Sequence, residues 1–307
     1  MIIDCRCRLT LAGEAEYFRD RVSHAGQLGR VPGLRAQTIE AFFAELDAAG
    51  VTTALSVSGC NPGAKFGRFE LPARTSSNEV MAEVQATYPG RFIGVAGIDV
   101  SNQMHDARHE LKRCVEELGL FVVFIEPGRA PGCNLDDPLL YPLYEYCEAQ
   151  RVTLVPQTSG LLGGKLLDYA NPKYIEKVAS DFPGLNIICG HGCYPYVREA
   201  IVMACRYDNV WLAPDSYLYH LGHADWLQAV NFNALGFASR FVFASAYPLN
   251  ALAEQVEKFR GLPWKPETLP KLLCDNAAAA LRLAERPAFR DSPQGAELLG
   301  VGAGRRD

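Results

Sequence analysis

Residues 104–125, MHDARHELKRCVEELGLFVVFI, contain in one stretch the unit that decides the fold. Residues 104–118 have the composition of a helix, which Gly119 ends because glycine readily adopts the backbone conformation that closes a helix. Residues 120–125 form a continuous apolar run, as expected of a parallel strand that is covered on both faces. The stretch therefore predicts a helix followed by a buried parallel strand.

The same alternation extends from this unit toward both ends of the chain. Apolar, strand-like runs recur, each followed by a helical pattern, and they lie near Ile2, Val51, Phe92, Leu120, Val152, Asn186, Val210 and Phe241. Alternating strands and helices imply a parallel sheet of the α/β class, and eight units favour a single closed (β/α)₈ barrel, the TIM-barrel architecture. An open doubly wound sheet is the alternative, but Cys5-Arg6-Cys7-Arg8 is not the Gly-rich turn that it requires after its first strand. We predict a barrel over residues 1–286 and a loosely packed tail over 287–307.

Composition excludes several classes of function. The 307 residues include 30 Lys and Arg against 35 Asp and Glu, a net charge of −5, which argues against a broad nucleic-acid surface. No apolar run approaches the roughly 20 residues of a membrane helix, and the first residues lack the pattern of a signal peptide. The ten cysteines are dispersed, so we expect most of them to be reduced and buried in a cytoplasmic protein without nucleic-acid or membrane partners.

Polar side chains mark the carboxyl ends of the predicted strands, where (β/α)₈ barrels carry out their chemistry. Because alternate residues of a strand face the same way, Arg6 and Arg8 share one side of the first strand, and Cys5 and Cys7 share the other. The candidate residues at the ends of later strands are Glu126, Gln157, His191, Asp215 and Tyr247.

Several motifs, in order and with consistent spacing, carry a resemblance to a known family. They are residues 4–8 (DCRCR), 88–92 (YPGRF), 181–183 (DFP), 190–192 (GHG) and 245–248 (SAYP). The chain resembles the amidohydrolase-related branch of the amidohydrolase superfamily, which includes aminocarboxymuconate-semialdehyde decarboxylase, aromatic-acid decarboxylases, and hydrolases and hydratases of small carboxylic acids. The resemblance implies a TIM barrel and a small-molecule carboxylate as substrate or ligand.

The resemblance also implies a divalent metal, but the residues at most of its ligand positions differ. Arg6 and Arg8 replace a His-x-His pair that points into the barrel, so the resemblance implies that both arginines face inward and that Cys5 and Cys7 face the helices. Gln157 replaces the histidine of strand five, and Ala246 replaces the aspartate of strand eight. Only His191 retains the residue type of the family. Arginine stays protonated and has no free lone pair, and a catalytic zinc site needs about three protein ligands. We therefore expect neither a metal nor another cofactor.

Three functional hypotheses stay open. In the first, a metal-independent hydrolase or lyase binds a small acid through Arg6 and Arg8, His191 moves a proton, and Gln157 and Tyr247 orient the substrate. In the second, the barrel is catalytically silent and binds a small acid or pairs with an active homologue. In the third, it is a conventional metal-dependent hydrolase with relocated ligands.

Two structural alternatives accompany these hypotheses. Glu126 and Asp215 either line the substrate site or neutralise the arginines in internal salt bridges, because a buried arginine is costly unless it is paired. For Asp215 a third role, the N-cap of the following helix, is favoured over a catalytic one. The long segment from Ser58 to Ser76 is a lid, a contact in a homo-oligomer, or a mobile surface loop.

Overall fold

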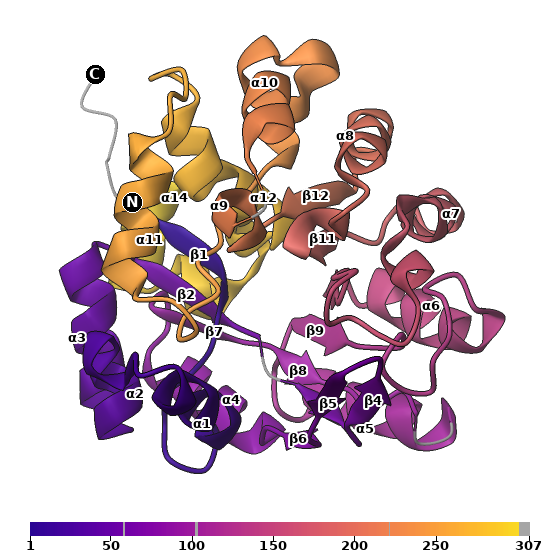
Figure 1. Ribbon diagram of the computed structural model, residues 1–307, viewed down its shortest axis with the longest axis horizontal. Coiled ribbons are helices and arrows are strands. Elements are labelled where there is room, and N and C mark those ends of the chain that lie inside the picture. Colours follow the sequence, from indigo (N-terminus) through magenta and orange to yellow (C-terminus); the bar gives the residue numbers. More distant parts are fainter. Residues whose placement is uncertain (58, 102–103, 221, 301–307) are drawn as a thin grey trace.

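The computed structural model describes residues 1–57, 59–101, 104–220 and 222–300, with strands at the centre and helices around them (Figure 1). The strands of the central sheet pair in parallel. They are β1 (Ile3–Cys7), β2 (Thr53–Ser56), β7 (Phe92–Gly94), β8 (Ala96–Gly97), β9 (Val122–Ile125), β10 (Thr153–Pro156), β11 (Ile187–Gly190) and β12 (Val210–Ala213).

The ladder of backbone hydrogen bonds around the barrel is interrupted at two places, and the barrel is nevertheless closed at both. The third barrel strand is split, so that β7 pairs with β2 and β8 pairs with β9. Residues 241–244 lie between β12 and β1: the Val242 amide donates to the Leu212 carbonyl at 3.1 Å, and the Cys5 amide donates to the Phe243 carbonyl at 3.1 Å. The prediction of a closed (β/α)₈ barrel is therefore confirmed.

The outer helices begin and end at residues suited to those positions. Thr38 and Ser77 accept hydrogen bonds from the amides of the first helical turn, and Gly50 ends its helix with a φ of 69°. These helices are α3 (Ile39–Ala49), α4 (Asn78–Thr87), α5 (Met104–Glu116), α6 (Tyr141–Ala149), α7 (Pro172–Asp181), α8 (Val197–Arg206), α10 (Ala224–Phe232) and α11 (Leu252–Gly261). Two short helices, α1 (Glu16–His24) and α2 (Pro32–Ala36), follow β1, and α9 (Tyr217–His220) follows β12. Among the described helices, none is long and apolar enough to cross a membrane.

The core has two parts, one inside the barrel and one between the strands and the helices. The inner cluster includes Ile3, Leu55 and Phe124, and Cys7 belongs to the outer cluster as predicted. Cys5 was expected to face the helices but belongs to the inner cluster. The reason is an irregularity in the β1–β2 register between Asp4 and Cys7, which breaks the simple alternation of the strand. All ten cysteines are free thiols.

Residues 287–299 form two helices where a loosely packed tail was expected. They are α13 (Pro287–Arg290) and α14 (Pro293–Leu299), each with proline in the first turn, where the missing N–H is tolerated. Phe289 is buried in the inner cluster with residues of α12 (Asn276–Ala280). This part of the chain therefore closes the barrel interior, and residues 301–307 lie outside the described part.

The segment after β2 is a folded arm, which we call the β3–β6 arm. It consists of β3 (Cys60–Asn61), β4 (Ala64–Phe66), β5 (Phe69–Leu71) and β6 (Arg74–Thr75), with antiparallel pairing of β4 with β5 and of β3 with β6. The arm is thus a pair of short ladders, and it carries Arg74 to the mouth of the barrel. Ser58, with which the predicted segment began, lies outside the described residues.

Candidate active site at the carboxyl end of the barrel

Arg6 is at the centre of the site, buried among side chains from three later strands. Its Nη2 donates to Gln157 Oε1 and to His191 Nε2, each at 2.9 Å, and its Nε lies 3.0 Å from Asp215 Oδ2. Its guanidinium carbon lies 5.5 Å from the centre of the Phe124 ring, inside the barrel. The inward orientation predicted for Arg6 is therefore what the structure shows.

The contacts of His191 determine which of its nitrogens carries the proton. Because an arginine side chain only donates, Nε2 must accept from Arg6, and the proton of the neutral ring belongs to Nδ1. Nδ1 lies 2.8 Å from Asp215 Oδ2. Burial, followed by the charge of Arg6, lowers the pKa of His191 to about 4. The ring is thus held neutral, with its basic nitrogen already occupied.

Asp215 supplies the negative charge of this group. Burial alone would raise the pKa of Asp215, but the neighbouring His191 and Arg6 outweigh burial and hold that pKa below its ordinary value. Of the three roles considered for Asp215, an internal salt bridge is the one that its side-chain contacts describe.

Arg8 is the exception among the buried charges of the mouth. Only 7% of its surface is exposed, yet its side chain makes no hydrogen bond and has no carboxylate oxygen within 4.0 Å among the described residues. Its guanidinium carbon lies 5.0 Å from the centre of the Phe18 ring on α1. Burial and the charges of Arg6 and Arg74 lower the pKa of Arg8 to about 9. Arg8 is a buried cation without a counter-ion in the described protein.

Glu126 is the second carboxylate of the site, and it is paired with two arginines. Arg129 Nη1 lies 2.8 Å from Glu126 Oε1, and Arg74 and Asn61 both donate to this carboxylate. Burial raises the pKa of Glu126, but the charges of Arg129, Arg74 and Arg6 outweigh burial, and the pKa ends below its ordinary value. Glu126 thus neutralises neither Arg6 nor Arg8 by direct contact.

Charges at the mouth do not balance. Four buried arginines (Arg6, Arg8, Arg74 and Arg129) face the two paired carboxylates of Glu126 and Asp215. Asp4 is also buried, but it accepts hydrogen bonds from the Arg6 amide and from Ser245, and burial raises its pKa. Even if Asp4 is ionised, one positive charge remains in excess, so the mouth is electrostatically suited to an anion.

Sequence reasoning missed Arg74 and Arg129, and it misplaced Tyr247. Arg129 follows Glu126 by three residues, a spacing that could have signalled the pair, whereas Arg74 reaches the site only through the fold of the β3–β6 arm. Tyr247 was expected to orient a substrate, but its hydroxyl donates to Glu45 on α3 at 2.7 Å, and its ring lies near Phe42 in the helix layer. Tyr247 therefore lies outside the group formed around Arg6.

The residues at the family's metal positions do not fit a metal ion. Gln157 and His191 direct their acceptor atoms at one nitrogen of Arg6, and the guanidinium occupies the point on which they converge. Ala246 offers no ligand atom. The described residues contain no group of three or more His, Cys, Asp or Glu side chains arranged to hold a metal, relocated ligands included.

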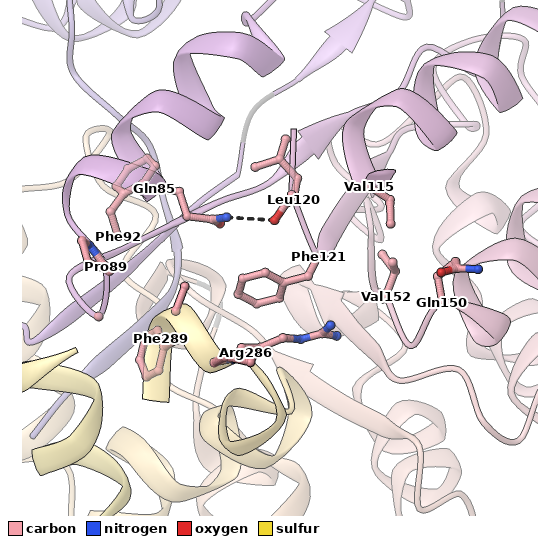
Figure 2. Close-up of a pocket in the computed structure, with 14 residues that line it drawn as sticks. Gln85, Pro89, Phe92, Val115, Leu120, Phe121, Gln150, Val152, Arg286 and Phe289 are labelled. Atoms are coloured by element: carbon pink, nitrogen blue, oxygen red, sulfur yellow. Dashed lines mark hydrogen bonds between the residues drawn. The ribbon is translucent and has the colours of Figure 1, made fainter. Parts of the chain in front are cut away.

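A separate pocket of about 210 Å³ lies at the opposite end of the barrel (Figure 2). Residues at or just before the first residues of β7, β9 and β10 line it, among them Phe92 and Phe121, together with Arg286 and Phe289 from the C-terminal segment. The side chain of Gln85 lies along one side of the pocket, and its Nε2 donates to the Gly119 carbonyl at 3.0 Å. Because catalytic groups of (β/α)₈ barrels lie at the carboxyl ends of the strands, this pocket is not the candidate active site.

Comparison with known proteins relates this chain to amidohydrolases. A family model described as amidohydrolase matches residues 3–283. The 2-amino-3-carboxymuconate-6-semialdehyde decarboxylase of Dictyostelium discoideum is 26% identical over 144 residues, which are 47% of this chain and only 37% of that protein.

Among solved structures, an uncharacterised TIM-barrel protein from Bordetella bronchiseptica is 34% identical, with a TM-score of 0.78 over 93% of this chain and 99% of that one. The 4-oxalomesaconate hydratase of Rhodopseudomonas palustris is 18% identical, with a TM-score of 0.65 over 98% and 99% of the two chains. At this identity, the likeness to the hydratase concerns the fold.

Proposed function

The chain belongs to the amidohydrolase family, and from that premise we propose that it is a divergent, metal-independent lyase or hydrolase that acts on a small carboxylic acid. One observation carries the proposal, namely that Arg8 is buried at the mouth of the barrel without a counter-ion among the described residues. A buried charge left unpaired is strongly destabilising, and a carboxylate is the planar partner that a guanidinium binds with two parallel hydrogen bonds. The name of the Dictyostelium relative, which describes the decarboxylation of a carboxylic acid, supports this substrate class.

Arg6 serves as the fixed cation of the proposed site. Gln157, His191 and Asp215 hold its guanidinium, which provides positive charge close to the bound acid. This charge can stabilise negative charge that develops on the substrate, but it does not activate water as a metal ion does. Of the two arginines first expected to bind the acid, Arg8 is thus the one available to contact it.

The proposal changes the role of His191. A proton-transferring histidine needs a free basic nitrogen, whereas Nε2 of His191 accepts from Arg6. His191 is therefore a positioning residue for Arg6.

A catalytically silent barrel that binds a small acid is the second candidate. It is favoured by the same contacts, because they occupy His191 and pair the carboxylates of Glu126 and Asp215. Turnover separates the two candidates: an enzyme of lyase type releases carbon dioxide from a panel of small dicarboxylates or aromatic acids, and a silent barrel binds such acids without consuming them.

Calorimetric titration with benzoate, succinate and phosphate tests the binding step. Replacing Arg8 by glutamine should weaken binding by about 1.5–3 kcal/mol, the worth of a hydrogen bond to a charged group, or roughly 10- to 150-fold. Arg68→Gln is the matched control, because Arg68 is an exposed arginine of the β3–β6 arm. The proposal is wrong if the parent binds none of these anions or if Arg8→Gln binds them as tightly as the parent.

A further inference from the structure

The loop after β10 and the helix α9 meet in a hydrogen bond that the proposed function does not use. The Oγ of Ser159 lies 2.7 Å from the hydroxyl oxygen of Tyr217, and both residues are buried. The contact bridges the carboxyl ends of β10 and β12 and passes over the end of β11, which lies between these strands.

The surroundings of Ser159 determine which hydroxyl donates. Ser159 Oγ accepts hydrogen bonds from the amides of Leu161 at 3.2 Å and Leu162 at 3.0 Å. A serine oxygen has two lone pairs and one proton, so its proton remains for Tyr217. The Tyr217 oxygen accepts this proton, and the proton of Tyr217 itself has no acceptor among the described residues.

The ring of Tyr217 is fixed against the group around Arg6. Its centre lies 4.9 Å from that of the His191 ring and 5.2 Å from that of Tyr194, on which it stacks. Arg129 contacts the loop that carries Ser159, because its Nε donates to the Leu162 carbonyl at 2.9 Å. The phenol is thus held by its neighbours on three sides, beside the excess positive charge of the mouth.

We propose that the Tyr217 hydroxyl donates a hydrogen bond to an oxygen of the anionic ligand, and that Ser159 positions it for this contact. The inference rests on the proposed function, because the ligand is the small acid that Arg8 binds. Tyr217 then adds a neutral donor to a site otherwise built from cations, and it favours ligands that present an oxygen acceptor near β12. Burial raises the pKa of Tyr217, so the phenol keeps its proton at neutral pH.

Calorimetric titration of Tyr217→Phe with benzoate, succinate and phosphate tests the contact. We expect the affinity to fall about tenfold or more, since the lost hydrogen bond has a charged acceptor. Ser159→Ala keeps the phenol but frees it to rotate, so its affinity should fall less than that of Tyr217→Phe. Tyr219→Phe is the matched control, because Tyr219 belongs to the same helix and its hydroxyl lies 3.4 Å from the Gln255 carbonyl. Its affinity should match that of the parent.

A second measurement distinguishes a ligand contact from a purely structural role. If Tyr217 donates to the anion, saturating phosphate should raise the pKa of this phenol in an ultraviolet difference titration, and the shift should be missing in Tyr217→Phe. If the Tyr217→Phe variant fails to fold, the titration of the parent can still contradict the contact, because phosphate binding without any shift in phenol ionisation rules it out.

The outcomes separate the two proposals. A parent that binds no anion overturns the proposed function and the role of Tyr217 with it. If Arg8→Gln weakens binding while Tyr217→Phe binds as tightly as the parent, the role of Tyr217 is wrong and the proposed function stands. A parent that binds phosphate without any shift in phenol ionisation also overturns the role of Tyr217.

Discussion

Arg6 holds the position at which ligands of a related metal enzyme would converge, and this has a consequence for variants at the same residue. In Arg6→His, the imidazole can approach His191 and Asp215, whose side chains now contact the guanidinium of Arg6. Three such side chains meet the minimum of about three protein ligands for a zinc site. We expect this variant to bind about one equivalent of Zn²⁺ per chain, measured by elemental analysis after dialysis.

Arg6→Met is the control for the metal experiment. It empties the same position but adds no nitrogen ligand, so it should retain clearly less zinc than Arg6→His. Equal metal content in the two variants would contradict the geometry described around Arg6.

His191 should make stability depend on pH in a window set by its two pKa values. The pKa is about 4 in the folded state, against 6.5 for an unperturbed histidine. Between these values the unfolded state binds more protons, so the free energy of unfolding falls as the pH falls. The difference of 2.5 pKa units corresponds to about 3 kcal/mol lost between pH 7 and pH 4.

Urea unfolding at several pH values in this range measures the effect. Other carboxylates titrate in the same range, so the informative quantity is the difference from His191→Gln, which should lose less stability on acidification. Parallel curves for the two proteins would show that His191 is not held neutral.

Sequence reasoning succeeded at single residues where one rule sufficed, and it failed where two elements had to be placed together. The inward orientation of Arg6 follows from the register of strand one that the family resemblance implies, but Cys5 departs from the alternation because the β1–β2 register is irregular there. Tyr247 could not be placed because its direction depends on the turn after the eighth strand.

At the scale of the elements, the last residue of β11, Gly190, packs closely against the side chain of Arg6. Gly190 has an ordinary φ of −66°, so its backbone would accept any residue. A Cβ at this position, however, would lie 2.3 Å from Arg6 Nη1. The absence of a side chain at Gly190 is therefore required by Arg6 and not by the turn.

Gly190→Ala should therefore destabilise the protein. Overpacking of a buried site typically costs about 1–3 kcal/mol, and here it also displaces Arg6 from its partners. Gly261→Ala is the matched control, since a Cβ at Gly261 would have no atom within 4 Å and this residue ends α11. Chemical denaturation of both variants makes the comparison, and equal stability would mean that Arg6 does not lie against Gly190.

The β3–β6 arm was the element that sequence reasoning described least well. Its residues suggested a lid, an oligomer contact or a mobile loop, because short antiparallel ladders leave little periodic signal. The structure shows that one of its arginines, Arg74, pairs with Glu126, so the arm completes the mouth of the barrel. The site therefore depends on contacts between segments about 50 residues apart, which no local pattern encodes.

On the scale of the whole molecule, the repeated unit of apolar strand and helix was enough to predict the barrel. Parallel strands must be buried on both faces, so their continuous apolar runs are hard to mistake when eight of them recur. The C-terminal residues were harder, because Gly and Arg near the end gave 287–307 the composition of a tail. Phe289 is the buried residue that fixes this segment in the inner cluster, and Leu298 and Leu299, which are partly buried, pack against the same cluster.

Phe289 therefore provides a test of how the barrel is closed at the amino ends of its strands. It is 4% exposed and shares the inner cluster with Leu281 and Leu283. Replacing a buried phenylalanine by alanine typically costs about 3–5 kcal/mol, because the apolar contacts are lost and the cavity is not refilled. Phe289→Ala should lower the free energy of unfolding by that amount in urea denaturation. Phe232→Ala removes the same ring from an 80% exposed position and should change stability by no more than about 0.5 kcal/mol. If the two variants unfold at the same urea concentration, the C-terminal segment does not close the barrel, and residues 287–299 are the loosely packed tail that their composition first indicated.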